Sequence, residues 1–255
     1  MGFWDLLIVI PLGLLAGGLS GLLGIGGGLI FAPLLLGMGL SPHQALATST
    51  LAIVPTALSG TLIHLRSREI PADSGASIGI SAFITALLFS RLGHFVQGWQ
   101  LLALQTLLYV LLVFTVSAEP PASAVGLIRR PPLKGLALVG GVAGLAGGLL
   151  GLGGGLLMVP LIVRGLGLPI HLAIRFSTLA VACSASAASL QFVSEGRGLW
   201  SVGLLLGGLA AMSAQWTAAR IDRVGGQRLA WMLRMILLIL VFETGRRALS
   251  LALGW

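Results

Sequence analysis

Charged residues are scarce in this chain. Of its 255 residues, 7 are Asp or Glu and 15 are Lys or Arg, so 9% carry a charge, against roughly 25% in soluble domains. Residues 6–65 contain no Asp, Glu, Lys or Arg, which is enough chain for two or more membrane crossings of about 20 residues each. With 56% hydrophobic residues and a mean hydropathy of +1.04, a soluble fold could not cover its surface. The composition predicts a polytopic membrane protein and argues against soluble, secreted and nucleic-acid-binding classes.

Cysteine is also nearly absent. The single Cys183 rules out an intramolecular disulfide, a zinc cluster or an iron–sulfur site built by this chain alone. The sequence contains no cluster of carboxylates or other metal ligands, so we expect no metal and no cofactor. Acids are outnumbered, giving a net charge of +8. That surplus fits the anionic headgroups at the ends of membrane spans, and it also fits an anionic substrate.

Apolar windows predict an all-α fold with about eight transmembrane helices. They lie near residues 4–23, 43–65, 74–92, 99–118, 134–150, 169–193, 199–219 and 229–252. The last is interrupted by Arg234, Glu243, Arg246 and Arg247. The connection from Glu119 to Lys134 contains four prolines and indicates a linker. We therefore divide the chain into a first four-helix half at residues 1–118, a linker at 119–133 and a second half at 134–255.

The two halves repeat each other. The segment Gly21-Leu-Leu-Gly-Ile-Gly-Gly-Gly-Leu-Ile-Phe-Ala-Pro33 matches Gly148-Leu-Leu-Gly-Leu-Gly-Gly-Gly-Leu-Leu-Met-Val-Pro160 at an offset of 127 residues. After one inserted residue the offset becomes 128, which pairs His43 with His171 and Ser49-Thr50 with Ser177-Thr178. An even number of crossings per unit would give parallel repeats and an odd number inverted ones.

Each glycine run is followed by about 11 apolar residues, at 28–38 and 155–165. Eleven helical residues rise only about 16 Å, half the hydrocarbon thickness. The pattern predicts a broken or re-entrant half-helix in each half. Its N-terminal amides would attract an anion. The residues concerned are Gly26, Gly27, Gly28, Gly153, Gly154 and Gly155.

Glycines also recur at regular spacing upstream of each run. Gly13, Gly17 and Gly21, like Gly140, Gly144 and Gly148, have the four-residue spacing of membrane helix contacts, and we assign them to packing. A nucleotide loop fits poorly, because no strand precedes the run and no P-loop lysine follows it.

Polar residues inside the predicted spans are the next candidates. Arg175 has no acid within ten residues, and its counterpart is Ala47. It either contacts a bound anion or extends to a nearby interface. The hydroxyls of Ser49, Thr50, Ser177 and Thr178 either bind an oxyanion or bond to their own helix.

Three ionisable residues are weaker candidates for proton coupling or gating. His43 and His171 could serve in that role or could cap their helices. Glu243 could relay protons or pair with Arg246, Arg247 or Arg234.

An enzyme must also be considered. Gly18-Leu-Ser20-Gly21 is similar to the sequence around a rhomboid serine, with His64 or His171 as the base. The pattern is short and lies within the packing glycines, so we expect no catalytic residue.

The paired Gly-x-Gly-Gly-Gly segments, followed by Pro33 or Pro160 and then by Ser-Thr, resemble the sulfite exporter TauE/SafE family of membrane permeases. The resemblance covers residues 5–252. It implies seven or eight helices in two homologous halves and the movement of sulfite, sulfonates or related small anions across the bacterial cytoplasmic (inner) membrane. It also implies that Gly24–Pro33 and Gly151–Pro160 line the central site, with the Ser-Thr pairs beside it. Because Arg175 has no counterpart, we expect an asymmetric site.

We therefore expect a secondary transporter, in the direction of export, that carries a small inorganic or organic anion by alternating access of two repeats. A small-anion channel and an intramembrane enzyme using Ser20 are the alternatives. The expected partners are that anion and membrane lipid, with no nucleic acid, and a homodimer remains open.

The distribution of basic residues favours a cytoplasmic N-terminus. Cytoplasmic connections would then hold Arg66, Arg68, Arg129, Arg130, Lys134, Arg197, Arg246 and Arg247, and outer ones Arg91, Arg220, Arg223 and Arg228.

Overall fold

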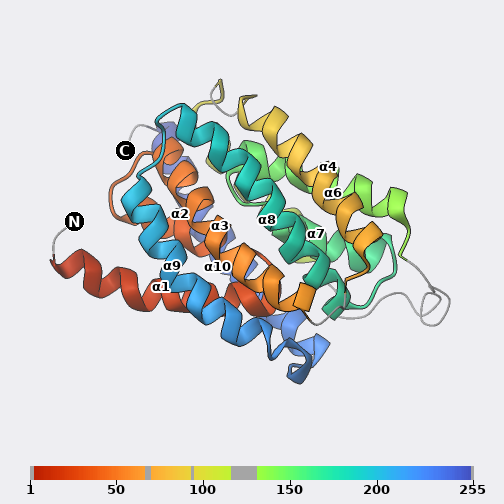
Figure 1. Cartoon of the computed structure of the whole chain (residues 1–255). Helices are drawn as coiled ribbons and strands as arrows, with labels where there is room; N and C mark the ends of the chain where they lie inside the picture. The colour runs from red at the N-terminus through yellow and green to blue at the C-terminus, as the bar shows by residue number, and fades with distance from the viewer. Residues whose placement is uncertain (1–2, 67–69, 93–94, 116–130, 254–255) are drawn as a thin grey trace.

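The computed structural model describes residues 3–66, 70–92, 95–115 and 131–253, with residues 3–9 as backbone only. The described part is all-helical (Figure 1). The first half has α1 (Phe3–Leu23), α2 (Gly28–Gly37), α3 (Pro42–Arg66), α4 (Ala72–Ser90) and α5 (Gly98–Thr115). The second has α6 (Leu133–Leu150), α7 (Gly155–Pro160) with its π-helical continuation η3 (Leu161–Gly165), α8 (Ile170–Ser194), α9 (Trp200–Ala218), the 3₁₀ turn η4 (Ile221–Arg223) and α10 (Gly226–Leu253).

The eight long helices expected from the sequence are all present. Five of them, α3, α4, α5, α6 and α8, are long and apolar enough to span a membrane by length and composition. The other three are α1, α9 and α10, and α10 continues unbroken past the four charged residues that interrupt its apolar window, Arg234, Glu243, Arg246 and Arg247. The two short helices α2 and α7 start where the half-helices were expected. Most of the expected linker, residues 119–130, lies outside the described residues. The chain is a polytopic membrane protein.

The evenly spaced glycines pack helices of different halves together. A Cβ atom at Gly17 would lie 2.0 Å from the Ala210 carbonyl oxygen on α9, and one at Gly21 would lie 2.4 Å from that of Ala214. Gly144 and Gly148 approach α4 in the same way. The pairs α1–α9 and α4–α6 therefore run parallel in close contact (Figure 1). The packing role is confirmed, and it interleaves the two halves of the sequence.

Helices α3 and α8 cross at the centre of the molecule. Residues late in α3 meet residues early in α8, as in the contact between Gly60 and Thr178, while Ala47 meets Ala188. The two helices are therefore antiparallel. They cross at Ile53 and Val181, which both lie against Gly26 and are 128 residues apart. Because α3 and α8 occupy the same place in their halves, the halves are inverted with respect to each other.

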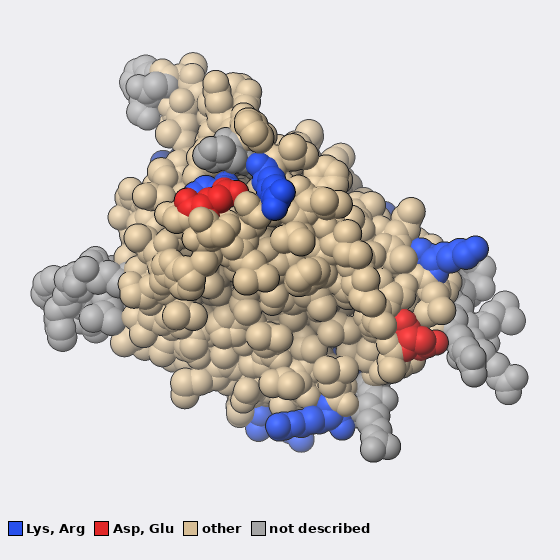
Figure 2. All heavy atoms as spheres, turned by 45° about the horizontal axis from the view of Figure 1, so that its top comes forward, with Lys and Arg blue, Asp and Glu red and all other residues tan. Residues whose placement is uncertain are grey.

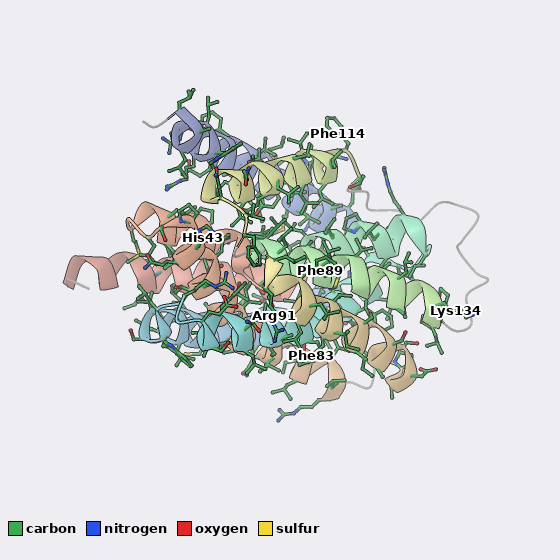
Figure 3. The ribbon with its side chains drawn as sticks, turned by 90° about the horizontal axis from the view of Figure 1, so that it is seen from above. His43, Phe83, Phe89, Arg91, Phe114 and Lys134 are labelled. Atoms are coloured by element: carbon green, nitrogen blue, oxygen red, sulfur yellow. The ribbon has the colours of Figure 1, made fainter. Side chains whose placement is uncertain are left out.

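Neighbouring helices form two lobes and a separate pair. Lobe A contains α1, α2, α3 and α9, and lobe B contains α4, α6, α7 and α8. Helices α5 and α10 pack mainly on each other, with a hydrogen bond of 2.9 Å between Thr106 and Thr244. Seen from above, this pair lies along one side of the molecule (Figure 3). Each half thus contributes helices to both lobes.

The chain traverses the molecule from one end to the other. We call end A the end where α3 begins and α4 ends, and end B the end where α8 begins and α9 ends. Helix α1 runs parallel to α9 until Gly21 lies beside Ala218 at end B. The glycine segment then returns to mid-depth at Gly28, against Ile53, and α2 continues to end A, where Gly37 lies near Arg247.

Charged side chains lie toward the margins of the face in Figure 2, and most of that face is uncharged. End A holds Arg91, Arg197, Arg246 and Arg247, whereas end B holds Arg66, Lys134, Arg164, Arg175, Arg220, Arg223 and Arg228. Arg234, two turns into α10, is counted at neither end.

The expected grouping of basic residues is therefore wrong. It placed Arg66 and Arg197 on one side, but Arg197 donates to the Ser90 carbonyl at the opposite end of α4 from Arg66. The error arises because each glycine segment and the short helix after it traverse the molecule together. Arg68, Arg129 and Arg130 lie outside the described residues.

Candidate functional site

Two glycine loops meet at the centre of the fold. We call residues 24–28 and 151–155 together the glycine cross. Gly24, Gly26 and Gly27 have φ values of 67, 75 and 78°, and their counterparts Gly151, Gly153 and Gly154 have 65, 69 and 74°. Side-chain-bearing residues adopt this left-handed region at a cost of roughly 1–2 kcal/mol each. The repeated sequence therefore encodes the same backbone path twice.

The loops also approach each other too closely for side chains. A Cβ atom at Gly155 would lie 2.7 Å from the Gly24 carbonyl oxygen and 2.9 Å from the Ile25 Cα atom. At Gly28 it would lie 2.3 Å from the Ile53 Cδ1 atom on α3 and in ordinary contact, at 3.5 Å, with the Leu152 carbonyl oxygen of the other loop. All residues of the glycine cross are buried. Six of the predicted site residues, Gly26 to Gly28 and Gly153 to Gly155, are thus brought together.

Helices α2 and α7 both begin at the glycine cross. Their N-cap residues, Gly27 and Gly154, are left-handed and make no side-chain capping hydrogen bond. The third amide of each helix, Ile30 N–H or Leu157 N–H, donates to its N-cap carbonyl at 3.0 or 3.2 Å. A helix N-terminus carries roughly half a positive charge. Two partly positive helix ends therefore lie at mid-depth. Their charge comes from the backbone, because residues 24–28 and 151–155 include no basic side chain.

Hydroxyl groups hold the cross from both sides. Ser177 donates to the Gly24 carbonyl at 2.8 Å and lies 3.1 Å from the Gly155 carbonyl, so it joins the two loops. Thr50 contacts the Gly151 carbonyl at 2.9 Å as well as the Leu46 carbonyl at 2.7 Å. Both hydroxyls are completely buried. Thr50 thus bonds to its own helix as well as to a loop, whereas Ser177 bonds to the two loops and not to its own helix.

Ser49 and Thr178 complete the predicted hydroxyl set. Ser49 donates to the Leu46 carbonyl at 3.0 Å and lies 3.4 Å from that of Gly151. Thr178 donates to the Ile174 carbonyl in its own helix, and its hydroxyl would lie 3.1 Å from a Cβ atom at Gly24. All four predicted hydroxyls therefore border the cross.

Ser184 is a site residue that sequence reasoning missed. Its hydroxyl donates to the Gly153 carbonyl at 2.8 Å and is completely buried. A signal was available, because Thr56 occupies the matching position 128 residues earlier. Thr56, however, bonds to Ala52 in its own helix and lies 3.5 Å from the Gly207 carbonyl of α9, away from the cross.

Arg175 lies toward end B, in an ion pair. One of its guanidinium nitrogens is 2.9 Å from both carboxylate oxygens of Asp222 in η4. Its side chain is 13% exposed and that of Asp222 is 64% exposed. Ser177 is two positions after Arg175, so their side chains lie on opposite faces of α8. The acid comes from 47 residues away, which a search along the neighbouring sequence could not find.

His43 and His171 lie outside the glycine cross, where each bonds to the segment before another helix. His43 Nε2–H donates to the Val96 carbonyl, and His171 Nε2–H donates to the Val224 carbonyl, both at 3.0 Å. Each bond ties the start of a long helix to the segment 53 residues further on. The two histidines therefore occupy matching positions in the two halves because they make the same structural bond in each.

Glu243 pairs with basic residues, as one of its two alternatives foresaw. It accepts from Arg247 at 2.6 Å and from Arg246 at 3.3 Å, near end A. Ser20 is buried on α1, and the Nε2 atom of His171 is already engaged with Val224. In the described part of the chain no three His, Cys, Asp or Glu side chains gather in a metal-binding group.

Comparison with known proteins agrees with this architecture. Residues 9–244 match the model of the family described as sulfite exporter TauE/SafE. A "probable membrane transporter protein" of Xylella fastidiosa is 29% identical over 217 residues, covering 82% of this chain and 83% of that protein. The "probable membrane transporter protein YunE" of Bacillus subtilis is 34% identical over 76 residues, covering 27% and 28% of the two chains. No solved structure matches.

These relatives are membrane transporters, and the catalytic alternative at Ser20 gains no support from them. The family match spans both glycine loops, both half-helices and the hydroxyl-bearing helices α3 and α8. The chain belongs to the sulfite exporter TauE/SafE family of membrane transporters.

Proposed function

We propose that this protein is a secondary transporter that exports small oxyanions, such as sulfite or organosulfonates, across the cytoplasmic membrane. The observation that supports this most is the glycine cross, where two half-helices begin at mid-depth and their N-caps make no side-chain capping hydrogen bond. Such sites attract anions, and paired broken segments are typical of transporter binding sites.

The hydroxyls of the cross would complete the site. Ser177 and Thr50 now donate to loop carbonyls, and a rotation about χ1 would turn either hydroxyl toward a bound oxyanion. Ser49 and Thr178 would add further donors. Arg175 would contact the anion at end B only after separating from Asp222, so its role in binding is the least direct.

The moving bodies would be the two lobes. Because α1 is bound along α9 and α4 along α6, the sequence halves cannot separate as rigid units. The lobes meet where α3 crosses α8 at Ile53 and Val181, and a rocking motion there would open the cross to each end in turn. The weaker proposals for His43, His171 and Glu243 would then concern the ends of the lobes, as gating.

The distribution of charge supports end B as the cytoplasmic end. Of the basic residues counted above, seven are at end B and four at end A, and cytoplasmic ends carry the excess. The N-terminus of α1 would then lie outside, which is the reverse of the orientation expected from the sequence.

The proposal is tested by flux in proteoliposomes. We expect saturable sulfite flux that sulfonates inhibit, and a Ser177→Ala variant with strongly reduced flux. Ser186→Ala is the matched control, because Ser186 bonds only to its own helix on α8. In the same assay, unchanged sulfite affinity in Arg175→Ala would remove that residue from the site.

A small-anion channel is the second candidate, because helix N-termini that attract an anion would also suit a path open to both sides at once. Ohmic conductance with no saturation and no counterflow would favour the channel over the transporter.

A further inference from the structure

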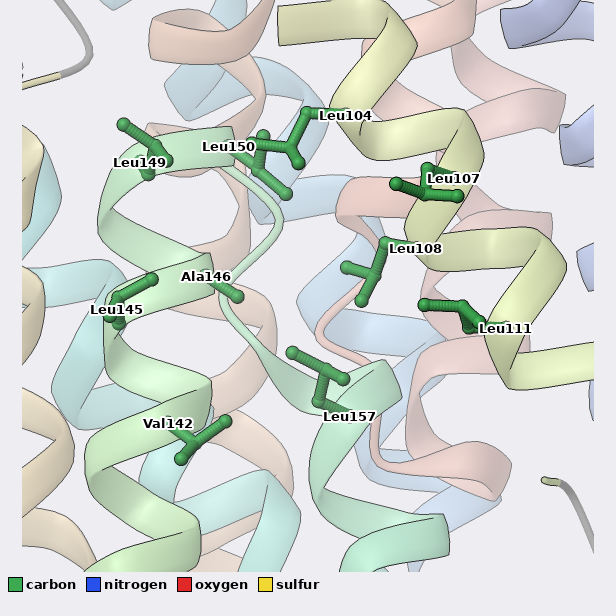
Figure 4. A pocket seen from close by; sticks show the side chains of 10 residues that line it. All are labelled: Leu104, Leu107, Leu108, Leu111, Val142, Leu145, Ala146, Leu149, Leu150 and Leu157. Atoms are coloured by element: carbon green, nitrogen blue, oxygen red, sulfur yellow. The ribbon is translucent and has the colours of Figure 1, made fainter.

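An apolar groove runs between α5 and the helices α6 and α7 (Figure 4). It contains two adjoining cavities of about 260 and 380 Å³, which share Leu108, Leu111 and Leu157 as lining residues. Leu104 and Leu111 on its α5 wall are 42% and 56% exposed. Because α5 packs mainly on α10, the groove remains open toward the surroundings.

The groove has the length of one membrane leaflet. On α5 its lining extends from Leu104 to Thr115, at the end-B terminus of the helix. Eleven helical steps rise about 16 Å, close to half of a hydrocarbon core of about 30 Å. An acyl chain entering from the end-B leaflet would fill the groove along this length.

The mouth of the groove is basic. Arg164 lines the larger cavity, is exposed, and donates to the Phe114 carbonyl at 3.4 Å. Lys134 is exposed at the start of α6, where the adjacent Gly135 lies against Leu166. Arg164 and Lys134 therefore both lie at end B, where lipid headgroups are expected. The rest of the groove lining is almost wholly apolar. In the described part of the mouth no acidic side chain lines the groove.

We propose that this groove binds an anionic phospholipid, with one acyl chain between α5 and α6–α7 and its phosphate at Arg164. Acyl chains bury favourably against leucine side chains, and guanidinium groups bind phosphate in two-pronged fashion. The π-helical turn η3 places Arg164 at the mouth, whereas the matching part of α2 stays α-helical and carries Leu36 instead. The position of the first half that matches Arg164 therefore offers no cation for a phosphate.

Lipid retention by the purified full chain tests this proposal. The protein is equilibrated with mixed micelles of phosphatidylglycerol and phosphatidylcholine that carry identical chains, and the lipid retained after washing is measured by mass spectrometry. We expect one phosphatidylglycerol per chain to resist washing. Arg164→Gln should weaken its binding about fivefold, and Arg223→Gln, a cation elsewhere at end B, should leave it unchanged.

A second variant addresses the acyl chain. Leu111→Trp would fill the groove at a residue that is already 56% exposed, so folding should be preserved. It should abolish retention of the lipid, while Leu138→Trp on the outward face of α6, which is 71% exposed, should not. Equal retention of both lipids, or unchanged retention by Arg164→Gln or Leu111→Trp, would overturn the proposal.

Discussion

Replacing Gly154 by alanine should destabilise the protein more than the same change at other left-handed glycines. At Gly154 φ is +74°, and a Cβ atom would lie 2.1 Å from the Ala143 carbonyl oxygen and 2.7 Å from its carbonyl carbon. The left-handed backbone alone costs alanine about 1–2 kcal/mol. Backbone atoms cannot rotate away, so overpacking adds about 1–3 kcal/mol. We expect a total loss of about 2–5 kcal/mol.

Three glycines provide controls for the two contributions. Gly39 has φ +87° with nothing within 4 Å, so Gly39→Ala should cost only the backbone strain of about 1–2 kcal/mol. Gly27, the counterpart of Gly154, meets only the movable ring of Phe31 at 2.8 Å, and its cost should be intermediate. Gly208 is helical with open space around it, so Gly208→Ala should stabilise by about 0.5–1 kcal/mol.

The assay is the unfolding of each purified variant in one detergent. The expected order of stability is Gly208→Ala, Gly39→Ala, Gly27→Ala and Gly154→Ala, from most to least stable. If Gly154→Ala were as stable as Gly39→Ala, then α6 would not approach the loop as closely as the structure shows, and the account of the glycine cross would be refuted.

Two further predictions concern the two histidines and the orientation of the protein in the membrane. His43→Ala and His171→Ala should each lower stability by about 0.5–1.5 kcal/mol, because each loses one bond to a carbonyl; a fall in anion affinity with stability unchanged would instead indicate a role in transport. In a Cys183→Ser background, an impermeant thiol reagent applied to intact cells should label Ser41→Cys at end A but not Gly225→Cys at end B, and the opposite pattern would reverse the orientation.

Local sequence patterns were sufficient for much of the fold. Long apolar windows located the helices, since each must satisfy its backbone groups within the membrane. The repeat located the glycine cross, because only glycine combines left-handed φ with close backbone approach. The hydroxyls of Thr50 and Ser177 were found by the same repetition, and they do border the cross.

Long-range relations could not be obtained from those patterns. Asp222 lies 47 residues from Arg175, and nothing in the intervening sequence indicates that η4 returns to α8. The four-residue spacing of Gly13, Gly17 and Gly21 shows that α1 packs closely on another helix, but it does not show that this helix is α9. The grouping of basic residues was wrong for a related reason: each glycine segment and the short helix after it together cross the molecule, and the sequence does not show this segment as part of a crossing.

Small oxyanions are proposed to cross the membrane through the glycine cross. The most direct measurement is sulfite flux into proteoliposomes containing the wild type, Ser177→Ala or Ser186→Ala. The account predicts saturable flux for the wild type and the Ser186 variant and a severe loss for the Ser177 variant, in which the bond joining the two loops is absent. Saturable flux that is unaffected by Ser177→Ala would contradict it.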